Sequence, residues 1–154
     1  MMNTSQIKLQ PLGLLLALLL TWLVTACAAV SDKTAGNMEK MESLQGTSWW
    51  VEDIAAKGVV DMSHTTIEFT DDGRIVGSTG CNRYFGSVEI DGAKITTGPL
   101  AGTRKACPGA LMDQESKFFQ AMSIVATWEI PATGLLHLRD ADGNSQIRAS
   151  RIEP

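Results

Sequence analysis

From Leu44 onward, hydrophobic and polar residues alternate over short runs, the period-2 pattern of half-buried β-strands. Turn residues such as Asp71-Asp72-Gly73 and Asp91-Gly92 separate consecutive runs, as expected of β-hairpins. The pattern predicts eight strands, over residues 48–54, 64–70, 74–79, 84–90, 93–97, 127–130, 135–139 and 146–151. Short strands joined by tight turns favour an antiparallel sheet.

One segment between Pro108 and Val125 breaks this alternation and has apolar residues at mostly helical spacing. Proline suits the entry to a helix because its missing N–H has no intrahelical partner there. The predicted inward stripe consists of Leu111, Glu115, Phe118, Phe119, Met122 and Val125. The fold class is therefore α+β, with a curved antiparallel sheet or partly closed β-barrel and one inserted helix.

A glycine-rich stretch, Gly77 to Gly86, lies between two of the predicted strands, and we call it the glycine corner. Glycine inside a strand pattern marks a bulge, a tight bend or a close approach of backbone. Asn82 tolerates left-handed dihedral angles better than most residues. The sequence predicts a sharp structural corner made by Gly77, Gly80, Asn82 and Gly86, with Cys81 at its apex.

The N-terminus has the features of a lipoprotein signal peptide, predicted over residues 1–26. A leucine-rich run from Leu12 to Val24 ends in Thr25-Ala26-Cys27, which looks like a bacterial lipobox. An uncleaved membrane anchor is the alternative, because an uncharged run that approaches ~20 residues comes close to spanning a bilayer. The lipobox favours lipidation of Cys27.

Residues 27–43 are predicted to be the lipidated cysteine and a polar tether whose reach is roughly 20 Å. The residue after the lipidated cysteine is Ala28. In lipoproteins of double-membraned bacteria, aspartate at this position retains the protein at the inner membrane. The resemblance to these lipoproteins therefore implies sorting to the outer membrane, with the domain facing the periplasm. Residues 44–154 form the single folded domain.

Lipidation of Cys27 leaves two cysteines, Cys81 and Cys107, and an even number in an oxidising compartment predicts a disulfide. Two alternatives use the same residues. Cys81 as a nucleophile would need His64 or His137 as its base. A zinc site built from both cysteines and both histidines lacks the close paired spacings of structural zinc sites.

Charged residues narrow the possible partners of the 154-residue chain, whose net charge is −4. Without a basic run or a nucleic-acid motif, nucleic-acid binding is not expected. Arg83 and Arg104 flank the cysteines and form either a cationic patch or ordinary surface ion pairs and caps. Glu115 lies on the apolar stripe of the helix, so we expect it to bind the backbone of the glycine corner or an arginine.

Four segments resemble the META domain family of HslJ-type heat-shock lipoproteins: Leu44-Gln45-Gly46-Thr47-Ser48-Trp49, the glycine corner with Gly80-Cys81-Asn82-Arg83, Thr103-Arg104-Lys105-Ala106-Cys107, and Gln114-Glu115. The resemblance extends over about residues 44–151 and departs at Trp50, where an aliphatic residue is more usual. It implies a small α+β domain in the bacterial envelope, associated with heat shock and antibiotic tolerance. It implies no catalytic activity, cofactor or metal.

The expected function is that of a non-enzymatic envelope lipoprotein, a binding or assembly factor for an unknown envelope protein. A carrier that holds a lipid or another apolar ligand in a barrel-like cavity is the alternative. An enzyme is the third class, and no catalytic motif in the sequence supports it.

Overall fold

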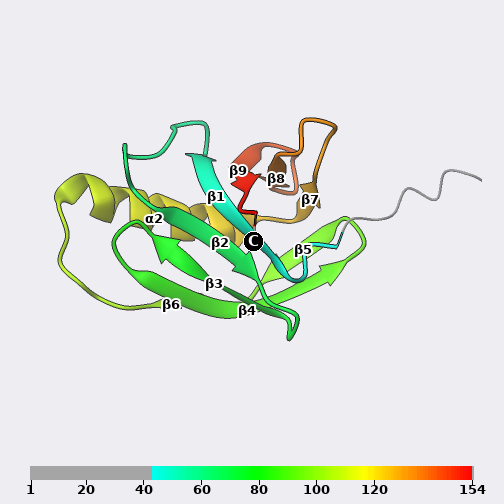
Figure 1. Ribbon diagram of the computed structural model, residues 1–154, viewed down its shortest axis with the longest axis horizontal. Helices are drawn as coiled ribbons and strands as arrows, with labels where there is room; N and C mark the ends of the chain where they lie inside the picture. The colour runs from blue at the N-terminus through cyan, green and yellow to red at the C-terminus, as the bar shows by residue number, and fades with distance from the viewer. Residues whose placement is uncertain (1–42, 154) are drawn as a thin grey trace, which may run out of the picture. The chain divides into compact units, whose positions relative to one another are not determined.

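The computed structural model describes residues 43–153, which form nine strands and one helix (Figure 1). The elements are β1 (Thr47–Ile54), β2 (Thr65–Phe69), β3 (Arg74–Thr79), β4 (Arg83–Asp91), β5 (Lys94–Thr97), β6 (Ala101–Gly102), α2 (Gly109–Ile124), β7 (Thr127–Glu129), β8 (Leu136–Arg139) and β9 (Ser145–Arg151). The predicted signal peptide and most of the predicted tether lie outside the described residues. Within residues 43–153, no helix has the length and apolar character needed to cross a bilayer.

The antiparallel sheet closes on itself. Its strands follow the order β3-β2-β1-β9-β8-β7-β5-β4-β6, and a further pairing between β3 and β4 joins the ends into a ring of eight strands. The long strand β4 makes this possible, because β3 lies along one edge while β5 and then β6 pair with the other. The predicted fold class is confirmed, and the sheet closes completely into a barrel.

Local alternation located the predicted strands to within a residue or two, with one omission. Strand β6 contains only Ala101 and Gly102, which is too short for any periodicity to show. It pairs with Tyr84 and Phe85 of β4 and leads into the loop that carries Cys107. The missed element therefore brings the second cysteine back to the glycine corner.

Large apolar side chains fill the space between the strands and the helix. Those that are less than 2% exposed are Trp49, Phe69, Phe118, Leu44, Ile54, Ile67, Ile75, Ile95, Met122, Leu136, Leu138 and Ile147. Helix α2 packs against β1, β3 and β9. Its Phe118 ring lies 5.0 Å from the ring of Tyr84, centroid to centroid, which joins the helix to β4.

Gly77 of the glycine corner lies in β3, directly opposite Tyr84 of β4. A Cβ atom at this position would lie 2.1 Å from the carbonyl oxygen of Thr66 and 2.9 Å from the Tyr84 hydroxyl. The Tyr84 hydroxyl donates a hydrogen bond to the same carbonyl over 3.0 Å. Burial raises the pKa of Tyr84, so this phenol stays protonated and remains a donor. The lack of a side chain at Gly77 therefore leaves the space in which the Tyr84 hydroxyl reaches the Thr66 carbonyl of β2.

We expect Gly77→Ala to destabilise the domain by about 3 kcal/mol or more, the upper end of the cost of overpacking, because the clash is with backbone. Gly109→Ala is the matched control: a Cβ atom there meets nothing within 4 Å, so the change should be neutral or should stabilise the helix by up to about 1 kcal/mol. Urea unfolding of both variants measures the difference. Equal stabilities would contradict the proposed role of Gly77.

Candidate functional site

The glycine corner contains the turn between β3 and β4, and Gly80 provides its left-handed residue with φ of +92°. A Cβ atom on Gly80 would also lie 3.0 Å from Ser63 and 3.1 Å from the side-chain amide of Gln114. Asn82 follows the turn and is not among the described residues with positive φ. Its tolerance of left-handed dihedral angles is therefore not used here, and its side chain explains its presence.

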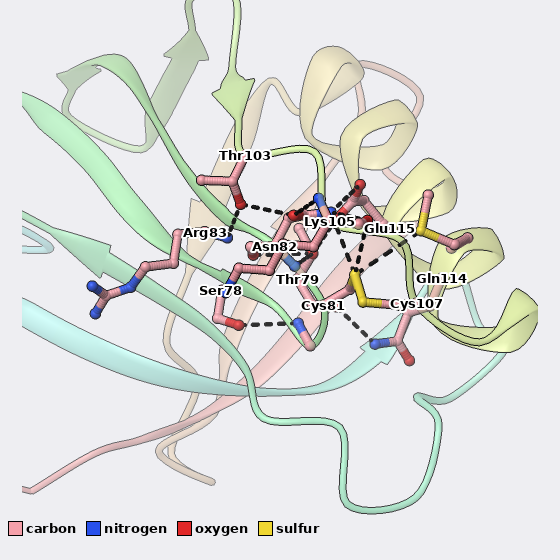
Figure 2. The surroundings of a disulfide bond; sticks show 12 residues. Ser78, Thr79, Cys81, Asn82, Arg83, Thr103, Lys105, Cys107, Gln114 and Glu115 are labelled. Atoms are coloured by element: carbon pink, nitrogen blue, oxygen red, sulfur yellow. Dashed lines mark hydrogen bonds between the residues drawn. A yellow bond between two sulfur atoms is a disulfide. The ribbon is translucent and has the colours of Figure 1, made fainter.

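The Asn82 side chain is 1% exposed and uses both ends of its amide (Figure 2). Its oxygen accepts hydrogen bonds from the Thr103 hydroxyl over 2.7 Å and the Lys105 backbone N–H over 2.8 Å. Its nitrogen donates to a carboxylate oxygen of Glu115 over 3.1 Å. One side chain thus joins the corner to the loop after β6 and to helix α2.

Glu115 is half-buried and accepts a second hydrogen bond, from the Thr79 hydroxyl. The same Thr79 oxygen accepts the backbone N–H of Asn82 over 3.1 Å. The prediction that Glu115 faces the glycine corner is confirmed, while its expected partners, backbone or an arginine, were wrong. Within residues 43–153, every buried side-chain nitrogen and oxygen has a hydrogen-bond partner.

Gln114, beside it on the helix, belongs to the segments that resemble the family, but the sequence predicted no role for its side chain. It is 5% exposed, and its amide nitrogen lies 2.9 Å from the Thr65 hydroxyl and 3.1 Å from the Thr79 carbonyl. Its amide oxygen accepts the backbone N–H of Val60 over 2.6 Å. Gln114 therefore fixes the β1–β2 loop against the corner. The signal for it was the polar pair Gln114-Glu115 inside an otherwise apolar helix face.

The predicted disulfide is present: Cys81 and Cys107 are bonded, with their Cα atoms 6.1 Å apart and a sequence separation of 26. Figure 2 shows the bridge beside Asn82 and the start of α2. Closing a loop of this length contributes roughly 3–4 kcal/mol in the chain-entropy model. In the disulfide, Cys81 offers no thiolate for nucleophilic attack.

The two histidines lie apart from any cluster of metal-binding groups. The exposed His64 contacts Trp50 in a tilted arrangement, with ring centroids 5.3 Å apart, while His137 lies in β8 between the buried Leu136 and Leu138. Across residues 43–153, no three His, Cys, Asp or Glu side chains are grouped so that they could hold a metal ion. No cluster of these residue types therefore supports the zinc alternative in this part of the chain.

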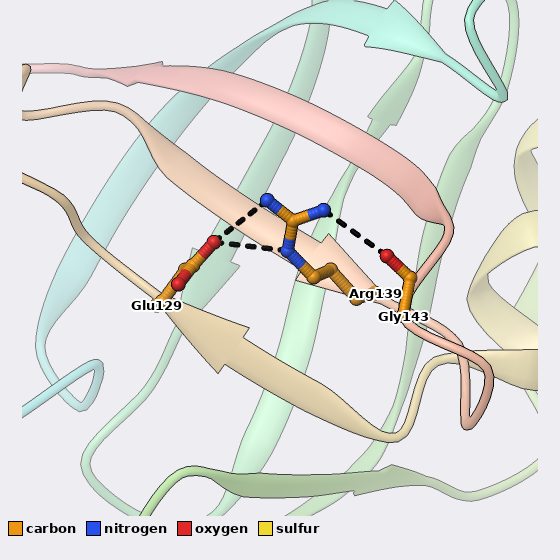
Figure 3. A network of polar contacts seen from close by, with 3 residues as sticks. All are labelled: Glu129, Arg139 and Gly143. Carbon is orange, nitrogen blue, oxygen red and sulfur yellow. Dashed lines mark hydrogen bonds and ion pairs between the residues drawn. The ribbon is translucent and has the colours of Figure 1, made fainter.

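Arg83 and Arg104 are both exposed, and neither takes part in the ion pairs of the described residues. Those pairs join Arg139 to Glu129 and Arg148 to Glu52. Figure 3 shows that Arg139 binds Glu129 through two nitrogens and also donates to the carbonyl of Gly143, which ties β7 to the β8–β9 hairpin. The expected surface ion pairs of Arg83 and Arg104 are absent from this part of the structure.

Comparison with known proteins identifies the fold at two levels. The family model of the META domain matches residues 42–151. An NMR structure of a protein from Burkholderia xenovorans is similar, with a TM-score of 0.60, 24% sequence identity, and coverage of 72% of this chain and 85% of that one. A second NMR structure has a TM-score of 0.57 at 25% identity and covers 73% and 95% of the two chains.

A crystal structure of a DUF4847 family protein from Bacteroides vulgatus has a TM-score of 0.53 at 16% identity, and the match covers 71% of this chain and 94% of that one. At this identity the similarity shows the fold alone. No curated protein matches the sequence.

We expect Glu115→Gln to destabilise the domain by about 1–3 kcal/mol, because two donors converge where the amide offers one accepting oxygen. Asp113→Asn is the control, since Asp113 is exposed on the same helix and its change should stay within about 0.5 kcal/mol. Urea unfolding with the disulfide intact measures both. If the two variants lose the same stability, the network does not fix the helix.

Proposed function

The chain belongs to the META domain family, and we propose that it is a non-enzymatic binding or assembly factor of the bacterial envelope. In this proposal a lipid on Cys27 holds it at the outer membrane, the domain faces the periplasm, and its role is linked to envelope stress or antibiotic tolerance, as the resemblance to HslJ-type lipoproteins implies. The folded domain supplies a rigid surface for a partner protein.

The observation that carries this proposal is an exposed tryptophan on the outer face of a barrel whose interior is packed with apolar side chains. Trp49 points inward and is fully buried, while its neighbour Trp50 is 39% exposed and contacts the ring of His64. Trp50 lies on the outer face of β1, opposite Thr66 of β2 and Ser150 of β9. Exposed tryptophan is typical of interfaces between proteins.

The carrier alternative has one feature in its favour. An apolar hollow of about 450 Å³ lies between the β5–β6 connection and α2, with Pro99, Leu100 and Phe119 in its lining. That size is within the usual range for ligand sites. The hollow is open at the surface, whereas a carrier of the barrel type would have to displace the packed core. Native mass spectrometry of protein from membranes distinguishes the two, because a carrier would retain a stoichiometric lipid other than the anchor.

For the anchor, we expect Cys27→Ser to give an unprocessed precursor that lacks the acyl chains, because the lipid is attached to that thiol before cleavage. Two or more acyl chains hold a protein stably at a membrane where one holds it only weakly. Mass spectrometry of the membrane fraction, before and after the change, measures this. A mature form that still begins at residue 27 and stays on the membrane would disprove lipidation at Cys27.

For the partner, a photocrosslinking residue at Ser150 should form an adduct with an envelope protein. Trp50→Ala should lower the yield of that adduct at least about tenfold, as expected of an interface hot spot. The control places the crosslinker at Ala141, in the exposed β8–β9 turn. Thermal unfolding verifies that the Trp50 variant is folded. An adduct at Ser150 that survives Trp50→Ala would place the partner elsewhere.

A further inference from the structure

A third sulfur atom lies beside the disulfide. The Sδ atom of Met112 is 4.0 Å from the Sγ atom of Cys81, which is bonded to Cys107. Met112 is 40% exposed on the first turns of α2, so burial in the core does not account for a methionine there. We propose that the reduced corner binds a single Cu(I) ion through the thiolates of Cys81 and Cys107 and the thioether of Met112.

One of the three sulfur separations already fits a three-coordinate site, that between Cys81 and Met112. With metal–sulfur bonds of about 2.3 Å, sulfur atoms arranged in a trigonal plane lie about 4 Å from one another. The Cys81–Met112 distance is already 4.0 Å. Reduction lets the Cys107 sulfur move away from that of Cys81, and Cα atoms 6.1 Å apart leave room for this without backbone movement.

The loops that carry the cysteines are held together by hydrogen bonds as well as by the disulfide. Asn82, next to Cys81, binds Thr103 and the backbone of Lys105, two residues before Cys107. Glu115, one turn after Met112, binds Asn82 and Thr79. These contacts do not involve sulfur, so they keep the three ligands near one another when the disulfide is broken.

One feature near each cysteine favours an anionic sulfur, while the Lys105 carbonyl oxygen, 3.7 Å from the Cys81 sulfur, opposes one there. Cys107 lies two residues before α2, and within residues 43–153 this helix has no side-chain N-cap and no acidic residue in its first turn. The N-terminus of the helix carries a partial positive charge and begins two residues after Cys107 along the chain. The Asn82 amide nitrogen lies 3.4 Å from the Cys81 sulfur, where it can donate to a thiolate as an outer-shell partner.

The chemistry of the ligands selects the metal. Thiolates and thioethers are soft ligands that favour Cu(I). Structural zinc sites are almost always four-coordinate, and no fourth His, Cys, Asp or Glu ligand joins the cluster in the described part of the chain. Cys81 and Cys107 are half-buried residues and Met112 is exposed, so the site lies near the surface, where an ion can reach it.

Two balanced steps form the site. A dithiol reductant passes two electrons and two protons to the Cys81–Cys107 bond, which breaks into two thiols while the reductant becomes a disulfide. Cu(I) then displaces one proton from each thiol to solvent and accepts the neutral Met112 thioether. The copper keeps its oxidation state, and the completed site carries one net negative charge.

The test is an anaerobic titration of the reduced domain, residues 28–154, with Cu(I) in competition with a chromogenic Cu(I) chelator. We expect one equivalent to bind the reduced domain and none to bind the disulfide form. Met112→Leu should lower the affinity at least about tenfold, because loss of even an outer-shell partner costs 10–100-fold. Met62→Leu is the control, since Met62 is 93% exposed in the β1–β2 loop and should change nothing.

Three results would overturn the proposal. Equal affinity of wild type and Met112→Leu would mean that the two thiols bind copper alone. Tighter binding of Zn(II) than of Cu(I) would mean that the ligand set does not select for a soft ion. Loss of the far-ultraviolet circular dichroism of the domain on reduction would mean that the hydrogen bonds do not hold the ligands in place. Copper X-ray absorption with three sulfur neighbours would support it directly.

Discussion

The buried amide of Asn82 imposes the constraint on which the arrangement of this domain depends. A buried polar group left without a partner costs about 1–3 kcal/mol, so Asn82 requires two other segments to be in place at once. Its partners are Thr103 and Lys105 in the loop after β6 and Glu115 in α2. Gln114 extends the same requirement to the β1–β2 loop. Apolar packing holds the helix against the barrel, and these directional contacts decide its position along the barrel.

The disulfide and the hydrogen-bond network act on the same corner through different states of the chain. The bridge between Cys81 and Cys107 stabilises mainly by restricting the unfolded chain, whereas the network contributes only when the native geometry is formed. The two effects are therefore separable. The proposed copper site depends on this separation, since the hydrogen bonds that join Asn82, Gln114 and Glu115 to their partners do not include the bond between the two sulfur atoms.

Much of the fold follows from local sequence, because strand alternation and the helical stripe are properties of consecutive residues. The glycine corner was also predicted, although Gly77 is explained only by the Thr66 carbonyl and the Tyr84 hydroxyl, which approach it from the two neighbouring strands. Complete closure of the barrel could not be predicted, since it depends on β3 and β4 pairing while β4 also binds β5 and β6. Gln114 was missed as a buried residue because its partners lie 35 to 54 residues away in the sequence.

Two exposed apolar side chains, Trp50 and Met112, are not explained by the stability of the folded domain. Trp50 alternates correctly with the buried Trp49 and Val51, so its position is dictated by β1, yet nothing in the core requires an indole on the outer face. Met112 is likewise placed by α2 but packs into no core, and its sulfur lies beside Cys81 instead. Both side chains expose apolar surface at a cost in solubility. In our proposals each side chain contacts something outside the folded domain, a protein surface for the indole and a soft ion for the thioether.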